Sequence, residues 1–291
     1  MKVVIDKNAG VCGGVSRALR FAEDALKNGK ATVSIGPLIH NQVEIDRLSQ
    51  LGLETVPQDI FEKSNGWIKK YADSNLLIRA HGIAPTLQKS FEKDGFSIID
   101  GTCPKVRNSL EIIGKYAEDG YQIIIVGKAE HPEVKAMVGA AANSAIVVLK
   151  YDEAQKVEIA PKCLVIAQTT TNQQNFLKIV ESFREQNSDI IVKNTICNAV
   201  SKRHEHLKSF AKQHDVIIFI GGKNSSNTKE LFEICRAENY QSYLIEKFSE
   251  IDLQWLLEAR SVGISGSAST PWWQLERIRS ELAASLLDCT T

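Results

Sequence analysis

Three of the chain's six cysteines share a local setting that suits metal binding. Each follows a short apolar stretch and a polar loop and precedes a segment with a helical pattern: Cys12, Cys103 and Cys197. The free amide groups at a helix N-terminus favour the thiolate, which is the form of cysteine that ligates metals. Any one of them could instead be a small apolar residue packed under a turn. Three in one context, at nearly equal spacing, predict a shared metal site.

The cysteine pattern favours an iron–sulfur cluster over zinc. Zinc sites usually contain close C-x-x-C pairs, and the sequence has none. Iron–sulfur clusters are held by thiolates, most often four, so three cysteines would leave one iron open, as catalysis requires. The remaining cysteines fit structural or incidental roles in an apolar run, a helix pattern and the C-terminal tail: Cys163, Cys235 and Cys289.

Polar residues collect where apolar strands end, which is where α/β proteins place functional groups. Three histidines follow such strands: His40, His81 and His131. Hydroxyl and amide side chains occupy further loops: Thr169, Ser225, Ser226, Asn227 and Ser269. Each could be a helix N-cap or a local hydrogen-bonding group, but together they predict an anion site at helix N-termini. The P-loop spacing is absent, so nucleoside triphosphate binding is unsupported.

One carboxylate stands beside this group of loops. Glu133 follows Pro132 at an expected helix start. A carboxylate there complements the helix dipole, which is a structural role. The functional alternative makes Glu133 a proton source close to a leaving hydroxyl group.

Short apolar runs alternate with helical patterns along the whole chain, which predicts an α/β fold with mostly parallel sheets. The expected strands are 3–5, 32–35, 76–78, 97–99, 123–126, 146–149, 163–167, 190–192, 216–220 and 242–245. The clearest expected helices are 15–27, 108–118, 175–186, 201–213 and 228–239. The repeated strand–loop–cysteine–helix pattern predicts three similar α/β units, 1–100, 101–193 and 194–291, each contributing one cysteine.

Composition indicates an ordinary globular protein. Of the 291 residues, 43% are hydrophobic and 24% are charged, and 35 basic residues balance 35 acidic ones. This balance gives no reason to expect a nucleic-acid or anionic-membrane surface. No apolar run reaches the roughly 18–20 residues that span a bilayer, and the start of the chain does not resemble a signal peptide. We therefore expect a cytoplasmic protein, where thiols stay reduced.

Motifs spanning nearly the whole chain resemble those of the LytB/IspH family. They run over residues 10–15, 39–41, 80–82, 102–104, 131–134, 168–170, 196–197, 223–227 and 266–269. The resemblance implies a trefoil of three α/β units around a central [4Fe–4S] cluster, one per chain, with Cys12, Cys103 and Cys197 as ligands. The fourth iron would then bind the substrate's hydroxyl group.

The same resemblance implies reduction of 4-hydroxy-3-methylbut-2-enyl diphosphate to isopentenyl and dimethylallyl diphosphate, the last step of non-mevalonate isoprenoid biosynthesis. Ferredoxin or flavodoxin would supply the electrons, and Glu133, with Thr169 nearby, would deliver the proton. The diphosphate would be held by His40, His81, His131, Ser225, Ser226, Asn227 and Ser269. No nucleic-acid or membrane partner is expected, and the chain would be a monomer or a weak homodimer.

The chain departs from the family pattern in two places. Many relatives carry a Thr-x-x-Arg-Gln run after the third cysteine, where this chain has Ser201 to Glu205. An Ala-Pro pair is common after Ser269, where this chain has Thr270 and Pro271 followed by two tryptophans. Two alternatives stay open: a zinc hydrolase of phosphorylated substrates, which would hold stoichiometric zinc, and a non-catalytic iron–sulfur sensor, which would show no turnover.

Overall fold

The computed structural model describes residues 1–63, 66–223 and 225–288. Its strands are β1 (Lys2–Ile5), β2 (Thr32–Ile35), β3 (Leu53–Val56), β4 (Asn75–Ile78), β5 (Ser97–Asp100), β6 (Gln122–Val126), β7 (Ile146–Val148), β8 (Cys163–Ala167), β9 (Ile191–Lys193), β10 (Val216–Ile220), β11 (Ser242–Ile245) and β12 (Ser261–Gly266). Its helices are α1 (Gly13–Lys27), α2 (Gln42–Gln50), α3 (Gln58–Lys63), α4 (Gly66–Tyr71), α5 (Pro85–Lys93), α6 (Pro104–Glu118), α7 (Pro132–Ala140), α8 (Tyr151–Ala154), α9 (Gln173–Gln186), α10 (Asn198–Ala211), α11 (Ser226–Glu238) and α12 (Trp272–Asp288), with two 3₁₀ turns, η1 (Phe248–Glu250) and η2 (Leu253–Leu256).

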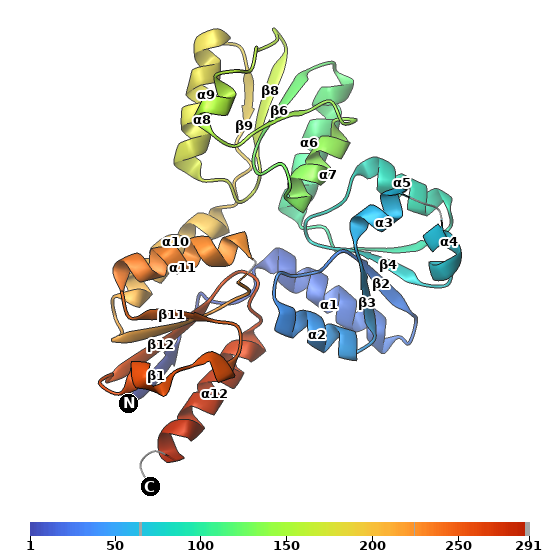
Figure 1. Cartoon of the computed structure of the whole chain (residues 1–291). Helices are drawn as coiled ribbons and strands as arrows, with labels where there is room; N and C mark the ends of the chain where they lie inside the picture. The colour runs from blue at the N-terminus through green and yellow to red at the C-terminus, as the bar shows by residue number, and fades with distance from the viewer. Residues whose placement is uncertain (64–65, 224, 289–291) are drawn as a thin grey trace. The chain divides into compact units, whose positions relative to one another are not determined.

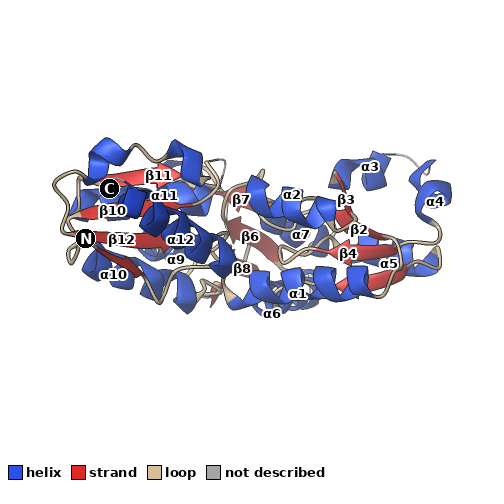
Figure 2. Cartoon of the chain, turned by 90° about the horizontal axis from the view of Figure 1, so that it is seen from below, coloured by secondary structure: helices blue, strands red, loops and turns tan. Residues whose placement is uncertain are grey.

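The strands form three small sheets of four strands each, flanked by helices (Figures 1 and 2). The strand orders are β3-β2-β4-β5, β7-β6-β8-β9 and β11-β10-β12-β1. Neighbours such as β2 and β4, β6 and β8, and β10 and β12 run parallel. The expected α/β fold with three small parallel sheets is confirmed.

All three sheets follow one topology, but the third takes its fourth strand from the other end of the chain. β1 pairs in parallel with β12, with Lys2 opposite Ser261 and Ile5 opposite Ile264. The expected first unit, 1–100, included this strand, because consecutive elements usually pack together. Its apolar residues instead fill the edge position that β12 leaves open. Cys12, Cys103 and Cys197 therefore each follow the fourth strand of a sheet.

The chain divides into two compact units, which we describe separately. Unit 1 comprises residues 1–19, 37–53 and 198–291, and it holds the third sheet. Alternate residues of β10 face opposite ways. Ile218 and Ile220 pack with Leu275 and Ile278 of α12, whereas Phe219 packs with Leu207 of α10 on the other face. Helices therefore cover both faces of this sheet, which explains its continuous apolar strands.

Unit 2 comprises residues 20–36 and 54–197, with the other two sheets. In the second of these, Ile124 and Val165 face α9, and Ile123 and Leu164 face α6 and α7. Helix α7 also packs against α5 of the neighbouring sheet. A Cβ atom at Gly139 would lie 2.4 Å from the Cβ of Ala84, so glycine is what permits this close approach.

One strand and several helices of the structure were not among the elements expected from the sequence. Strand β3 and helices α2, α3, α4, α5 and α8 are short, and their apolar periodicity is correspondingly weak. Helix α11 begins at Ser226, two residues before the expected start, because Ser225 acts as its N-cap. Every helix in the described parts of the chain is too short or too polar to cross a membrane.

Candidate functional site

The most unusual ionisable group in unit 2 is a carboxylate at the start of α7. Glu133 is only 2% exposed. Its Oε1 accepts a hydrogen bond from the backbone N–H of Thr169 at 2.7 Å, and its Oε2 accepts one from the Thr169 hydroxyl at 2.8 Å. Thr169 lies in the loop after β8 and is itself buried. Pro132, which fixes the first helical residue, explains why α7 begins here.

Burial decides the protonation of this carboxyl group. Loss of solvation raises the pKa of Glu133 from its ordinary value of 4.5 to about 7, although the two hydrogen bonds from Thr169 act in the opposite direction. With a pKa of about 7, this carboxyl group can gain or lose its proton near neutral pH. Glu133 therefore has the property that a general acid needs.

Two of the predicted histidines meet beside Glu133. The His131 ring contacts the His81 ring edge-on, with centroids 5.1 Å apart. His131 is also the N-cap of α7, because its Nδ1 accepts a hydrogen bond from the backbone N–H of Glu133 at 3.2 Å. A neutral imidazole that accepts at Nδ1 carries its proton on Nε2. His131 can therefore donate a hydrogen bond from Nε2 to an anion.

Backbone hydrogen bonds connect two of the cysteines to the same loops. The N–H of Cys103 donates to the carbonyl of Ala80, the residue before His81, at 3.0 Å. The N–H of Cys197 donates to the carbonyl of Thr169 at 2.8 Å. Cys103 is the N-cap of α6. Unit 2 thus brings two cysteines, two histidines and Glu133 into one continuous group of loops.

Unit 1 gathers the predicted hydroxyl and amide groups at the carboxyl ends of its strands. The Ser225 hydroxyl caps α11 by accepting from the N–H of Thr228 at 3.2 Å, so this residue is a helix N-cap. Asn227 Oδ1 accepts from the N–H of Ala268 at 3.0 Å, and the Ser269 hydroxyl bonds to that of Ser267 at 2.8 Å. Because Ser225 and Asn227 accept these bonds through oxygen, both keep their side-chain protons to donate. Ser226 is the first residue of α11, and its side chain lies outside the described part of the chain.

His40 belongs to the same part of unit 1. It follows β2 and directly precedes Asn41, the N-cap of α2. Its carbonyl oxygen would lie 2.2 Å from a Cβ atom at Gly222, so the loop that carries His40 packs tightly against the loop that leads to Ser225. Only a glycine at position 222 allows this contact.

The chemistry of the thiols separates the cysteines into two groups. Cys12, Cys103, Cys163, Cys197 and Cys235 are all free thiols. Burial raises the pKa of Cys163 and of Cys235 to about 11, so these two resist becoming thiolates, as their structural interpretation requires. The other three are half-buried and stand just before helices. Cys289 lies outside the described residues.

The surroundings of Cys12 include a cation. Cys12 precedes α1, and its carbonyl accepts from the N–H of Ser16 at 2.8 Å. Burial lowers the pKa of Arg203 in α10, while the nearby negative charges of Cys12 and Asp6 favour its charged form. Taken one by one, Cys12, Cys103 and Cys197 are free, half-buried thiols, which is the chemistry that an iron–sulfur ligand needs.

Nothing in the described ranges gathers three or more His, Cys, Asp or Glu side chains as closely as a single metal ion requires.

The structure also shows residues next to the candidate site that the sequence alone did not indicate. The buried side chains of Asn41, Glu44 and Gln274 and the half-buried Trp273 form a polar network that begins at the residue after His40. Two signals for it were present in the sequence: an acid and an arginine three residues apart, Glu44 and Arg47, and the unusual pair of tryptophans.

Comparison with known proteins finds a matching family and named relatives. The LytB protein family matches residues 3–283. A 4-hydroxy-3-methylbut-2-enyl diphosphate reductase of Campylobacter fetus subsp. fetus is 37% identical over 283 residues, which cover 97% of each chain. The enzyme of the same name from Aquifex aeolicus is 36% identical over 284 residues, covering 96% of this chain and 95% of the relative.

Two solved structures are similar to this chain. One, of (E)-4-hydroxy-3-methyl-but-2-enyl diphosphate reductase, the terminal enzyme of the non-mevalonate pathway, has a TM-score of 0.75 and 36% identity, covering 98% of this chain and 100% of the other. The second is a reductase from Plasmodium falciparum, with a TM-score of 0.80 over 97% of this chain and 87% of the other. At 24% identity it supports the fold alone.

Proposed function

Because the chain belongs to the LytB family, we propose that it reduces 4-hydroxy-3-methylbut-2-enyl diphosphate, with Glu133 as the general acid. The observation that carries this proposal is the environment of Glu133, a buried carboxyl with a pKa of about 7 held by Thr169. The reaction breaks one C–O bond and consumes two electrons and two protons. The hydroxyl group leaves as water, and the products are isopentenyl and dimethylallyl diphosphate.

The cofactor in this proposal is one [4Fe–4S] cluster per chain, with Cys12, Cys103 and Cys197 as its ligands. When bound, the cluster supplies electrons and an iron with an open coordination position. A reduced protein of the ferredoxin or flavodoxin type is the proposed electron donor. The proposed location is the cytoplasm, where such donors and reduced thiols occur together, and the proposed state is a monomer or weak homodimer.

The remaining site residues act on the diphosphate. His131 donates from Nε2, and His81 lies against its ring. In unit 1 the donors are His40, Ser225, Ser226, Asn227 and Ser269. Neutral donors and helix N-termini can together bind the oxygens of a diphosphate without a cluster of lysines. Thr169 donates to both oxygens of the Glu133 carboxyl and so keeps this group in one orientation.

The test is anaerobic purification with iron and acid-labile sulfide analysis, followed by turnover of the allylic diphosphate with a reduced viologen dye. We expect about four irons per chain, and we expect Cys103→Ser and Cys197→Ser to lose iron, sulfide and turnover. Cys163→Ala and Cys235→Ala are matched controls that keep all three, because both thiols are buried away from these loops. Wild-type protein with stoichiometric zinc and no sulfide would refute the proposal.

A further inference from the structure

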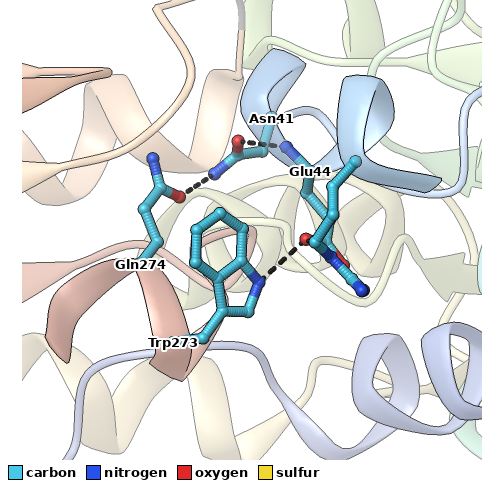
Figure 3. A network of polar contacts seen from close by, with 5 residues as sticks. Asn41, Glu44, Trp273 and Gln274 are labelled. Carbon is cyan, nitrogen blue, oxygen red and sulfur yellow. Dashed lines mark hydrogen bonds and ion pairs between the residues drawn. The ribbon is translucent and has the colours of Figure 1, made fainter. Parts of the chain in front are cut away.

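The loop that carries His40 is attached to α12 by two side-chain pairs within unit 1 (Figure 3). The indole N–H of Trp273 donates to Glu44 Oε2 at 2.9 Å. The side-chain amide of Asn41 donates to Gln274 Oε1 at 2.8 Å. Both pairs join the first turn of α2 to the first turn of α12, so these two helix starts are fixed relative to each other.

Glu44 is the centre of this network. It is 1% exposed, and both of its oxygens are used. Arg47 donates to Oε1 at 2.7 Å and to Oε2 at 2.8 Å, while Trp273 approaches Oε2 from α12. An arginine that bonds both oxygens, together with an indole donor, gives the carboxyl group a well-defined geometry. Glu44 therefore serves as an anchor for Trp273.

Asn41 connects this network to His40, the residue that precedes it in the chain. Its Oδ1 accepts from the backbone N–H of Glu44 at 3.2 Å, which caps α2. Gln274 then donates to the backbone carbonyl of Glu246 at 2.7 Å. Because Asn41 bonds both to Gln274 and to the Glu44 backbone, it fixes the backbone of His40 in its close contact with Gly222.

The same helix start controls the loop that contains Ser269. Helix α12 begins just after this loop, whose Thr270 hydroxyl donates to the carbonyl of Ile220 at 2.6 Å. Any shift of Trp273 would therefore move the Ser269 loop and the His40 loop in relation to each other. The two loops supply diphosphate donors in the proposed function.

We propose that Glu44 and Trp273 are positioning residues that hold His40 in register with the Ser225 and Ser269 loops for diphosphate binding. This inference rests on the proposed function. Neither residue touches the substrate, and both act through the Asn41 cap and the start of α12. Their loss would weaken diphosphate binding and leave the proton transfer at Glu133 intact.

The experiment compares Trp273→Phe and Glu44→Gln with the wild-type cluster-loaded enzyme. Trp67→Phe is the matched control, because Trp67 is buried among Phe61 and Phe91 of unit 2 and its indole N–H has no hydrogen-bond partner among the described residues. The measurements are KM and kcat, calorimetric binding of inorganic pyrophosphate, iron content and the thermal midpoint.

We expect Trp273→Phe to raise KM and the pyrophosphate Kd about tenfold, the value of one hydrogen bond to a charged group, with kcat within about twofold of wild type. Because the two residues act as a pair, the double variant should lose no more affinity than the larger single loss. Trp67→Phe should leave KM and pyrophosphate binding unchanged.

Unchanged KM and pyrophosphate Kd in both single variants would overturn the inference. So would a joint fall in kcat, iron content and thermal midpoint without a selective loss of affinity, since that is the result of a merely structural role. Wild-type enzyme without turnover or pyrophosphate binding would instead refute the proposed function itself, which separates the two failures.

Discussion

Two buried carboxylates, one in each unit, occupy similar positions and have different partners. Glu133 in unit 2 and Glu44 in unit 1 are 2% and 1% exposed. Each lies in the first turn of a helix that follows a histidine loop, α7 after His131 and α2 after His40. Residue type, burial and local structure are therefore almost the same for both.

The difference lies in the charge of the neighbours. Glu133 is held by the neutral hydroxyl and amide groups of Thr169, and burial raises its pKa to about 7. Glu44 shares its pocket with the Arg47 guanidinium, which donates to both oxygens, and with the Trp273 indole. Held by neutral donors, the buried Glu133 carboxyl has a raised pKa, whereas the arginine that bonds both oxygens of Glu44 holds that carboxyl group in a fixed geometry.

The largest expected effect is on turnover. Glu133→Gln keeps the shape of the side chain but removes its acidic proton, so we expect kcat to fall about 10²-fold or more with little change in KM. Glu44→Gln should instead raise KM and leave kcat nearly unchanged. Steady-state kinetics under anaerobic conditions measure both variants. Equal losses of kcat in the two would contradict the distinction between the carboxylates.

The second effect is on the way the free energy of unfolding depends on pH. The pKa of Glu133 is higher in the folded protein, about 7, than its ordinary value of 4.5. The folded state therefore binds this proton more tightly than the unfolded state does. The contribution of Glu133 to the free energy of unfolding is fully present below about pH 4.5 and is lost as the pH rises through about 7. The loss is about 3 kcal/mol. Urea unfolding between these pH values should show this slope in wild type and a flatter profile in Glu133→Gln.

A third variant makes the surroundings of Glu44 resemble those of Glu133. Arg47→Met removes the cation and leaves the carboxylate buried, which should cost about 2 kcal/mol of unfolding free energy because Arg47 is partly exposed and a fully buried pair would cost more. Lys70→Met is the control, since the Lys70–Glu54 pair lies at the surface and contributes little. Chemical denaturation measures both. Similar losses in the two variants would show that burial of the pair is unimportant.

The smallest effect concerns Thr169. Thr169→Val removes the hydroxyl donor to Glu133 Oε2 and keeps the backbone N–H donor to Oε1. Since this hydroxyl lowers the pKa of Glu133, its loss should raise that pKa further and move the alkaline fall of kcat upward by roughly one pH unit. The pH profile of kcat checks this. A downward movement would mean that Glu133 does not act as the acid.

Local signals predicted a large part of the fold and the candidate site. Apolar runs located β6, β8 and β10, and Pro132 marked the start of α7, because strands and helix starts depend on neighbouring residues. Ser225 was recognisable as a helix cap for the same reason. By contrast, the pairing of β1 with β12 joins the two ends of the chain, and a parallel pairing over such a distance leaves no local pattern.

The sequence by itself determined which residues could carry chemistry here: cysteines before helices, histidines after strands and a glutamate beside a proline. Only the tertiary structure decided what each carboxylate does. Glu133 and Thr169 are 36 positions apart, and Glu44 and Trp273 are 229 positions apart. Burial and the charge of the partner set the protonation of a carboxyl group, and both are supplied by residues that meet only when the chain folds.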